Sequence, residues 1–234
     1  MFWSPYMNLH RVAASLVFTL SLSAQAAVTS TFDTDAEGWS GLTARPSENS
    51  APIHDAGPFG AYSATGGNSG GYFRLPDPDD QDTFFSAPAQ FLGNQSSAVG
   101  GTLSYDLYTD ASINYAGPNV VLQGGGVTLV YVPATQPAVQ NNWVTVSVAL
   151  APSAAWHLGS AGGGAASAAD FQAALGNLNR LWISAETHSP VEEISGLDNV
   201  QLAAAVPEPA TAALMLLGVA AMAGIQSRRH VVAR

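Results

Sequence analysis

Two residue types are absent from this chain, and their absence excludes whole classes of chemistry. The 234 residues contain no cysteine and no lysine. Without cysteine there is no disulfide, no thiolate zinc site and no cysteine nucleophile. The fold must therefore draw its stability from a hydrophobic core, and residues 27–206 are numerous enough to form one domain with such a core.

Basic side chains are also scarce. Residues 27–206 carry sixteen Asp and Glu against three Arg, which gives this region a net charge of −13. A surface of this sign repels phosphate backbones, so we expect no nucleic-acid partner. The same surface suits divalent cations.

An apolar run marks the N-terminal end of the chain. A thinly charged segment ending in His10 and Arg11 precedes apolar residues 12–22, and the small residues Ala24 and Ala26 follow. This order is typical of a cleaved signal peptide over residues 1–26, because the apolar run is too short to span a bilayer. A buried N-terminal helix of the fold is the alternative.

A second apolar run lies near the C-terminal end. Pro207-Glu208-Pro209 precedes apolar residues 212–225, and Arg228 and Arg229 follow them. Two prolines this close cannot lie inside a helix, so they predict an extended joint before a transmembrane helix over 210–226. The arginine pair favours a cytoplasmic tail end, which places the domain outside.

This three-part order over residues 207–234 resembles the PEP-CTERM sorting signal. The resemblance implies recognition by an exosortase-type membrane transpeptidase in Gram-negative bacteria that make exopolysaccharide. It also implies a membrane-anchored precursor in the inner membrane, which then passes to the cell surface or the extracellular space. A plain single-pass anchor is the alternative.

The middle of the chain has the two-residue periodicity of β-strands. Leu103, Tyr105 and Leu107 alternate with polar residues, and the valines in 144–148 alternate with Trp143 and two polar residues. Such alternation is typical of antiparallel strands with one buried face. Further strands are expected over 28–32, 71–75, 119–123, 127–132, 181–185 and 197–202.

One helix is predicted. Ser167 and Asp170 form a capping pair ahead of an apolar face made by Phe171, Ala174 and Leu175. Many short strands with one short helix predict an all-β fold, an antiparallel β-sandwich of jelly-roll type over residues 27–206.

Two sequence strings carry a further resemblance. They are Ala87-Pro88-Ala89-Gln90-Phe91-Leu92-Gly93 and Gly196-Leu197-Asp198-Asn199-Val200. With Tyr105, Trp143 and Asp170 between them, their order resembles the laminin B domain, also called laminin domain IV, over roughly residues 30–203. The resemblance implies a galactose-binding-like β-sandwich and no conserved catalytic activity. The cysteine-rich repeats that flank this module in animal matrix chains are absent here.

Acidic residues at alternate positions indicate a candidate cation site. Asp33 and Asp35 are spaced as in an EF-hand loop, but Ala44 stands where that loop needs a bidentate glutamate, so an EF-hand is rejected. Asp33, Asp35 and Asp198 are the candidates for one structural calcium where the first and last strands meet. A turn-capping side chain is the alternative for Asp198.

Other polar motifs are weaker. The acidic cluster at 77–82 has an alternation that suits oxygen ligands, but the favoured interpretation is a solvated loop. Glu186, Glu192 and Glu193 have no spacing that indicates a glycosidase pair. The Gly-x-Ser-x-Gly string at 67–71 lacks the helix that a nucleophile elbow needs. No catalytic residue is assigned, and we expect a protein that is not an enzyme.

The tryptophans leave one binding alternative. Trp143 and Trp182 lie in expected strands and are predicted to be in the core. Trp156 lies in an expected loop and is the candidate ring for stacking on a sugar, although a core position is favoured for it too. The expected function is a structural or interaction module in the exopolysaccharide layer. The alternatives are a carbohydrate-binding module and, third, a secreted glycan-active enzyme.

The signal-peptide assignment predicts a mature N-terminus near Ala27, because Ala24 and Ala26 fit the small-residue subsites of a signal peptidase. Mass spectrometry of N-terminal peptides from envelope fractions measures this directly. Recovery of intact Met1-Phe2-Trp3 as the main N-terminal peptide would contradict the assignment.

Overall fold

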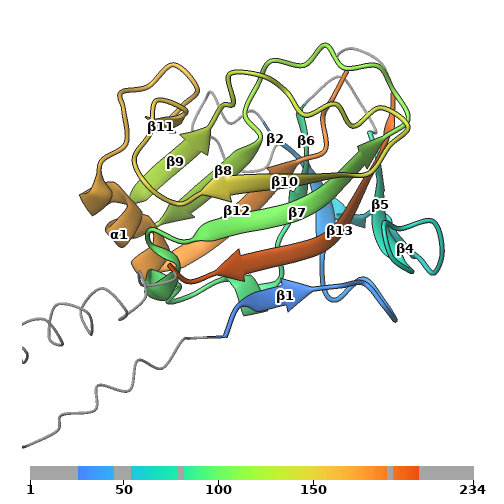
Figure 1. Cartoon of the computed structure of the whole chain (residues 1–234), viewed down its shortest axis with the longest axis horizontal. Coiled ribbons are helices and arrows are strands. Elements are labelled where there is room, and N and C mark those ends of the chain that lie inside the picture. Colours follow the sequence, from blue (N-terminus) through green and yellow to red (C-terminus); the bar gives the residue numbers. More distant parts are fainter. Residues whose placement is uncertain (1–25, 45–53, 78–81, 189–191, 206–234) are drawn as a thin grey trace, which may run out of the picture.

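The computed structural model describes residues 26–44, 54–77, 82–188 and 192–205. Within these ranges the chain forms two antiparallel β-sheets that enclose a hydrophobic core, with one short α-helix at one end (Figure 1). The prediction of an all-β sandwich with one helix is confirmed. The expected signal helix and the expected helix over 210–226 lie outside the described residues. None of the helices in the described part is both long and apolar enough to cross a bilayer.

The first sheet, sheet A, has the strand order β10-β7-β13-β5-β4, and β1 also pairs with β13. Its described strands are β1 (Val28–Ser30), β4 (Ala61–Ser63), β5 (Tyr72–Pro76), β7 (Thr102–Thr109), β10 (Val144–Ala149) and β13 (Ile194–Ala203).

The second sheet, sheet B, has the strand order β11-β9-β8-β12-β6-β2-β3. Its described strands are β2 (Ser40–Ala44), β3 (His54–Phe59), β6 (Asp82–Ser86), β8 (Val120–Gly124), β9 (Val127–Tyr131), β11 (Trp156–Leu158) and β12 (Leu178–Ser184).

Strand β13 lies between β7 on one edge and both β5 and β1 on the other (Figure 1). Its first half, from Ile194 to Leu197, pairs with β5, and its second half pairs with β1. The switch falls at Asp198 and Asn199, where the register with β7 shifts and Asn199 has a φ of +46°. This bulge turns the strand and leaves space beside it for a loop.

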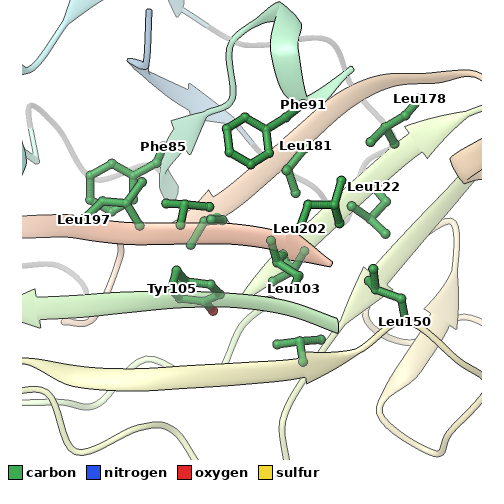
Figure 2. Packing of buried hydrophobic residues seen from close by; sticks show 14 of the residues in the cluster. Phe85, Phe91, Leu103, Tyr105, Leu122, Leu150, Leu178, Leu181, Leu197 and Leu202 are labelled. Atoms are coloured by element: carbon green, nitrogen blue, oxygen red, sulfur yellow. The ribbon is translucent and has the colours of Figure 1, made fainter. Parts of the chain in front are cut away.

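The core lies between the sheets and is made by side chains at alternate strand positions. Leu103 and Tyr105 of β7 and Leu197 and Leu202 of β13 point toward sheet B, from which Leu122 and other residues meet them (Figure 2). All are at most 3% exposed. Because successive strand residues point to opposite faces, the polar residues between them lie on the far side of sheet A.

The helix α1 (Ala168–Gly176) begins as the sequence predicts. Ser167 Oγ accepts a hydrogen bond from the Asp170 N–H, and Asp170 Oδ2 accepts one from the Ser167 N–H at 2.8 Å. Phe171 is fully buried with Leu175, and its ring lies 5.2 Å from the ring of Trp156. The helix therefore closes one end of the core beside β8 and β9.

The structure differs from the sequence expectations at several strands. The expected strand over 28–32 ends at Ser30, because Phe32 has a φ of +50° and turns the chain. Strands β2 and β6 were not predicted, since their apolar residues, Leu42 in β2 and the adjacent Phe84 and Phe85 in β6, show no alternation in the sequence. The short strands β3, β4 and β11 were not predicted either.

Candidate functional site

The candidate site lies on the outer face of sheet A, which we define as the surface directed away from sheet B. On β7, Ser104, Asp106 and Tyr108 alternate with core residues and so belong to this face. On β13, Gly196 and Asp198 belong to it, and Asp198 stands directly opposite Asp106 in the register. The two strands thus bring two carboxylates together on one side of the sheet.

Three half-buried aromatic rings, Tyr72, Tyr108 and Trp143, lie together on this face, and we call them the Trp143 cluster. The Trp143 ring lies 5.4 Å from Tyr72, nearly perpendicular to it, and 5.5 Å from Tyr108. Its indole N–H donates to the carbonyl oxygen of Gly66 at 3.0 Å. Trp143 therefore joins strands β5 and β7 to the loop that contains Gly66.

Asp106 is 4% exposed and accepts hydrogen bonds from three side chains. Asn68 Nδ2 donates to Oδ2 at 2.7 Å, Asn199 Nδ2 donates to the same oxygen at 2.8 Å, and Thr145 Oγ1 donates to Oδ1. The donors come from a loop and from β13 and β10. Asp106 is thus the centre of a network across the outer face.

Asp198 is fully buried beneath the same loop. Its Oδ2 accepts from the Ser69 N–H at 3.2 Å, and its Oδ1 accepts from the Asn199 N–H at 2.7 Å. Burial raises the pKa of Asp198 above its ordinary value; backbone N–H groups of Ser69, Asn199 and Asn68 partly offset this, and the nearby Asp106 adds a smaller increase.

Two glycines allow these close approaches. A methyl group at Gly196 would lie 2.7 Å from Trp143 Cη2 and 3.0 Å from Tyr72 Cδ2. A methyl group at Gly67 would lie 2.8 Å from Asp198 Oδ2. The distances of 2.7 and 2.8 Å are shorter than a real Cβ atom shows, so a side chain at either glycine would clash. The indole of Trp143 therefore packs directly on β13, and the loop packs directly on the Asp198 carboxylate.

A shallow hollow of about 200 Å³ opens beside this network, between strands β1, β7 and β13. Hydroxyl and amide side chains line most of it, namely Thr29, Thr31, Ser104, Asn199 and Gln201. Asn199 belongs to both features, because it lines the hollow and donates to Asp106. Aromatic rings and a polar hollow therefore share one face of the sandwich.

The three residues predicted to share a calcium ion lie in different settings. Asp33 Oδ2 accepts from Thr31 Oγ1 at 2.8 Å, and Asp35 Oδ1 accepts from the Glu37 N–H at 2.7 Å. Both aspartates are exposed, whereas Asp198 is buried. The described residues contain one carboxylate cluster close enough to hold a cation, and it does not include these three. Calcium binding by Asp33, Asp35 and Asp198 stays a prediction.

That cluster consists of Asp77, Glu186 and Glu193. The sequence shows these residues only as parts of two unrelated acidic segments more than one hundred positions apart. Asp77, expected in a solvated loop, is 7% exposed. The interpretation of this residue as solvated is wrong, because it lies where β5 ends against the start of β13.

Of the tryptophan predictions, the core position favoured for Trp156 is confirmed, its alternative as a sugar-stacking ring is wrong, and the core position of Trp143 is wrong. Trp156, the candidate exposed ring, is fully buried between Tyr131 and Phe171, and its indole N–H donates to the Ala149 carbonyl. Trp143, predicted to be in the core, is the half-buried ring of the outer face. Its position in the alternation with Val144 already places it on the polar side of β10. The core position predicted for Trp182 is confirmed at 4% exposure.

The family model described as Laminin B (Domain IV) matches residues 84–215. The match covers more than half of the chain, which therefore belongs to the laminin B family. A second model, described as the PEP-CTERM protein-sorting motif, matches residues 205–229. Both resemblances expected from the sequence are confirmed. The string at 196–200 supplies the surface below Trp143 (Gly196), two core residues (Leu197 and Val200), and Asp198 and Asn199, which lie beside Asp106.

Two solved structures are similar in fold. The L4b domain of human laminin alpha-2 is 20% identical, with 53% of this chain and 71% of that chain covered and a TM-score of 0.45. A family 11 carbohydrate-binding module of the cellulosomal cellulase Lic26A-Cel5E of Clostridium thermocellum is 15% identical, with 79% and 99% covered and a TM-score of 0.45. At this level of similarity, no binding residue of either structure is transferred to this chain. No curated protein matches the chain.

Replacement of Gly196 by alanine should displace the Trp143 ring, because the added methyl group would lie 2.7 Å from it. We expect a loss of about 1–3 kcal/mol in the free energy of unfolding, the usual cost of overpacking. Urea denaturation and near-ultraviolet circular dichroism measure the loss and the change in ring packing. Gly164→Ala is the matched control, since a methyl group there meets nothing within 4 Å. Equal stability of the two variants would contradict the close packing of Trp143 on β13.

Proposed function

We propose that this protein is an exported, non-enzymatic module of the extracellular polymer layer that holds a neutral polysaccharide on the outer face of sheet A. The observation that carries the proposal is that the Trp143 cluster and a hollow lined by hydroxyls and amides lie on the same face of sheet A. Sugars present flat apolar faces to aromatic rings and hydroxyl edges to polar side chains. One face of this domain offers both kinds of partner.

Export and surface delivery are supported by the sorting motif. The match over 205–229 contains Pro207-Glu208-Pro209 and the pair Arg228 and Arg229. The resemblance to this motif implies that an exosortase-type transpeptidase at the inner membrane recognises the protein. A domain delivered in this way meets the exopolysaccharide layer outside the cell.

The charge of the domain favours a neutral polymer over an acidic one. Residues 27–206 carry a net charge of −13, and like charges repel over distances of about 10 Å at ordinary ionic strength. A uronate-rich chain would meet this repulsion, whereas a neutral chain would not.

We propose binding without a catalytic step. The buried carboxylates on this face, Asp106 and Asp198, each accept hydrogen bonds from protein donors that hold them in place. They serve to fix Asn68 and Asn199 beside the hollow. An enzyme would use such a carboxylate on its substrate instead.

Replacement of Trp143 by alanine should weaken binding at least about tenfold, which is about 1.4 kcal/mol, because the indole is the largest ring of the cluster. The measurement uses an array of neutral and uronate-containing oligosaccharides, probed with the full-length protein and followed by titration of any positive sugar. Trp143→Phe should keep part of the affinity, since it retains a flat ring.

The matched control is Gln172→Ala, an exposed position on α1 away from the outer face of sheet A. It should bind like the wild type. Thermal melts of all variants show whether each is folded. Undiminished binding by folded Trp143→Ala protein, or binding restricted to uronates, would contradict the proposal.

Replacement of Glu208 by alanine should leave the protein in the inner membrane, because the sorting resemblance implies recognition of the Pro-Glu-Pro segment. Cell fractionation with detection of the domain measures the distribution. Thr211→Ala, just outside the segment, is the control and should be sorted normally. Normal surface display of the Glu208→Ala protein would favour a plain membrane anchor.

A further inference from the structure

A second polar site lies inside the sandwich, where the chain passes between the two sheets. Asp77 follows β5, Glu186 follows β12, and Glu193 precedes β13. The connections β5–β6 and β12–β13 both cross between sheet A and sheet B, and both contribute to this point. One carboxylate oxygen of each residue lies within 4.8 Å of one from each of the others. We call the three residues the acidic triad.

Two oxygens of the acidic triad are buried without a hydrogen-bond partner. Glu186 and Glu193 are 5% and 3% exposed, and Oε2 of each accepts no hydrogen bond from any described residue. The other oxygen of Glu193 is well supplied, with the N–H groups of Thr187 and His188 at 2.6 and 3.0 Å. Buried carboxylate oxygens are ordinarily hydrogen-bonded, paired with a positive charge or bound to a metal.

The electrostatics of the acidic triad favour a cation. One carboxylate oxygen each of Asp77, Glu186 and Glu193 lies within 4.8 Å of the others, all three residues are buried, and carboxylates this close repel one another when ionised. Several negative groups therefore converge where water is excluded. A divalent cation between them would turn this repulsion into attraction.

The backbone around the acidic triad holds the carboxylates in place. The Asp77 N–H donates to the Glu193 carbonyl at 2.8 Å, and the Glu186 N–H donates to the Thr83 carbonyl at 3.1 Å. Thr83 Oγ1 also donates to Asp77 Oδ1 at 2.7 Å. Thr83 lies on β6, so residues of both sheets form one frame around the site.

We propose that the acidic triad binds one calcium ion, which cross-links sheets A and B at the β5–β6 and β12–β13 connections. Calcium takes hard oxygen ligands at about 2.3–2.6 Å, so two ligands of one ion lie at most about 4.6–5.2 Å apart, and the oxygens of the acidic triad fall within that span. Magnesium, with ligands at about 2.0–2.1 Å, demands near-octahedral geometry and usually keeps several waters, which a buried set of three carboxylates does not favour. This site is separate from the outer face and from Asp33, Asp35 and Asp198.

The test uses full-length protein stripped with chelator and then given calcium chloride, magnesium chloride or chelator alone. Calcium at about one hundred times its dissociation constant should raise the melting temperature by about 5–10 °C, and magnesium should do less. Equilibrium dialysis with radioactive calcium should give an ion bound to each wild-type chain. Absence of both binding and stabilisation in the wild type would overturn the proposal, whatever the variants do.

The variants locate the ion. Glu186→Gln and Glu193→Gln should lose the calcium-induced rise, because each removes a ligand charge but keeps the side-chain shape. Glu192→Gln is the matched control, since it makes the same change at the neighbouring exposed glutamate, and it should keep the full rise. Asp198→Asn should keep it as well. A rise that survives in folded Glu186→Gln and Glu193→Gln proteins, or that is lost only in Asp198→Asn, would place the ion elsewhere and overturn the proposal.

Discussion

The pairing of β13 with β7 is the interaction on which the rest of this domain depends. In a chain without disulfides, the core must hold the two sheets together, and these strands contribute Leu197, Leu202, Leu103 and Tyr105 to it. The alternation that buries these residues also places polar partners on the opposite face. Core and candidate site are therefore two sides of the same pair of strands.

The bulge at Asp198 and Asn199 explains why the site forms where it does. At this point the strand paired with β13 changes from β5 to β1. The loop that contains Gly67 covers β13 there and packs against Asp198. Two opposed carboxylates, Asp106 and Asp198, would destabilise adjacent strands if left without donors. The loop and Asn199 supply those donors, so a local irregularity of the strand becomes an ordered polar surface beside Trp143.

Strands with apolar residues at alternate positions or in a run bounded by glycines were predictable from the sequence, and β7, β8, β10 and β13 lie close to their expected positions. Strands β2 and β6 were not, because Leu42 in one and the adjacent pair Phe84 and Phe85 in the other form no two-residue alternation. The side of Trp143 could have been read from its alternation with Val144. The proximity of Asp77 to Glu186 and Glu193 could not be predicted, because it depends on which strands of the two sheets are joined by the connections. The spacing of these residues along the sequence does not contain that information.

The central claim is that the outer face of sheet A is the binding face of this domain. Hydrogen–deuterium exchange of the full-length protein, with and without a saturating neutral oligosaccharide selected on the array, tests it most directly. If this face binds the sugar, we expect slower exchange in peptides covering residues 66–72, 104–108, 143–147 and 196–201, with sheet B unchanged. Protection confined to strands of sheet B, with these four segments unaffected at saturation, would contradict it.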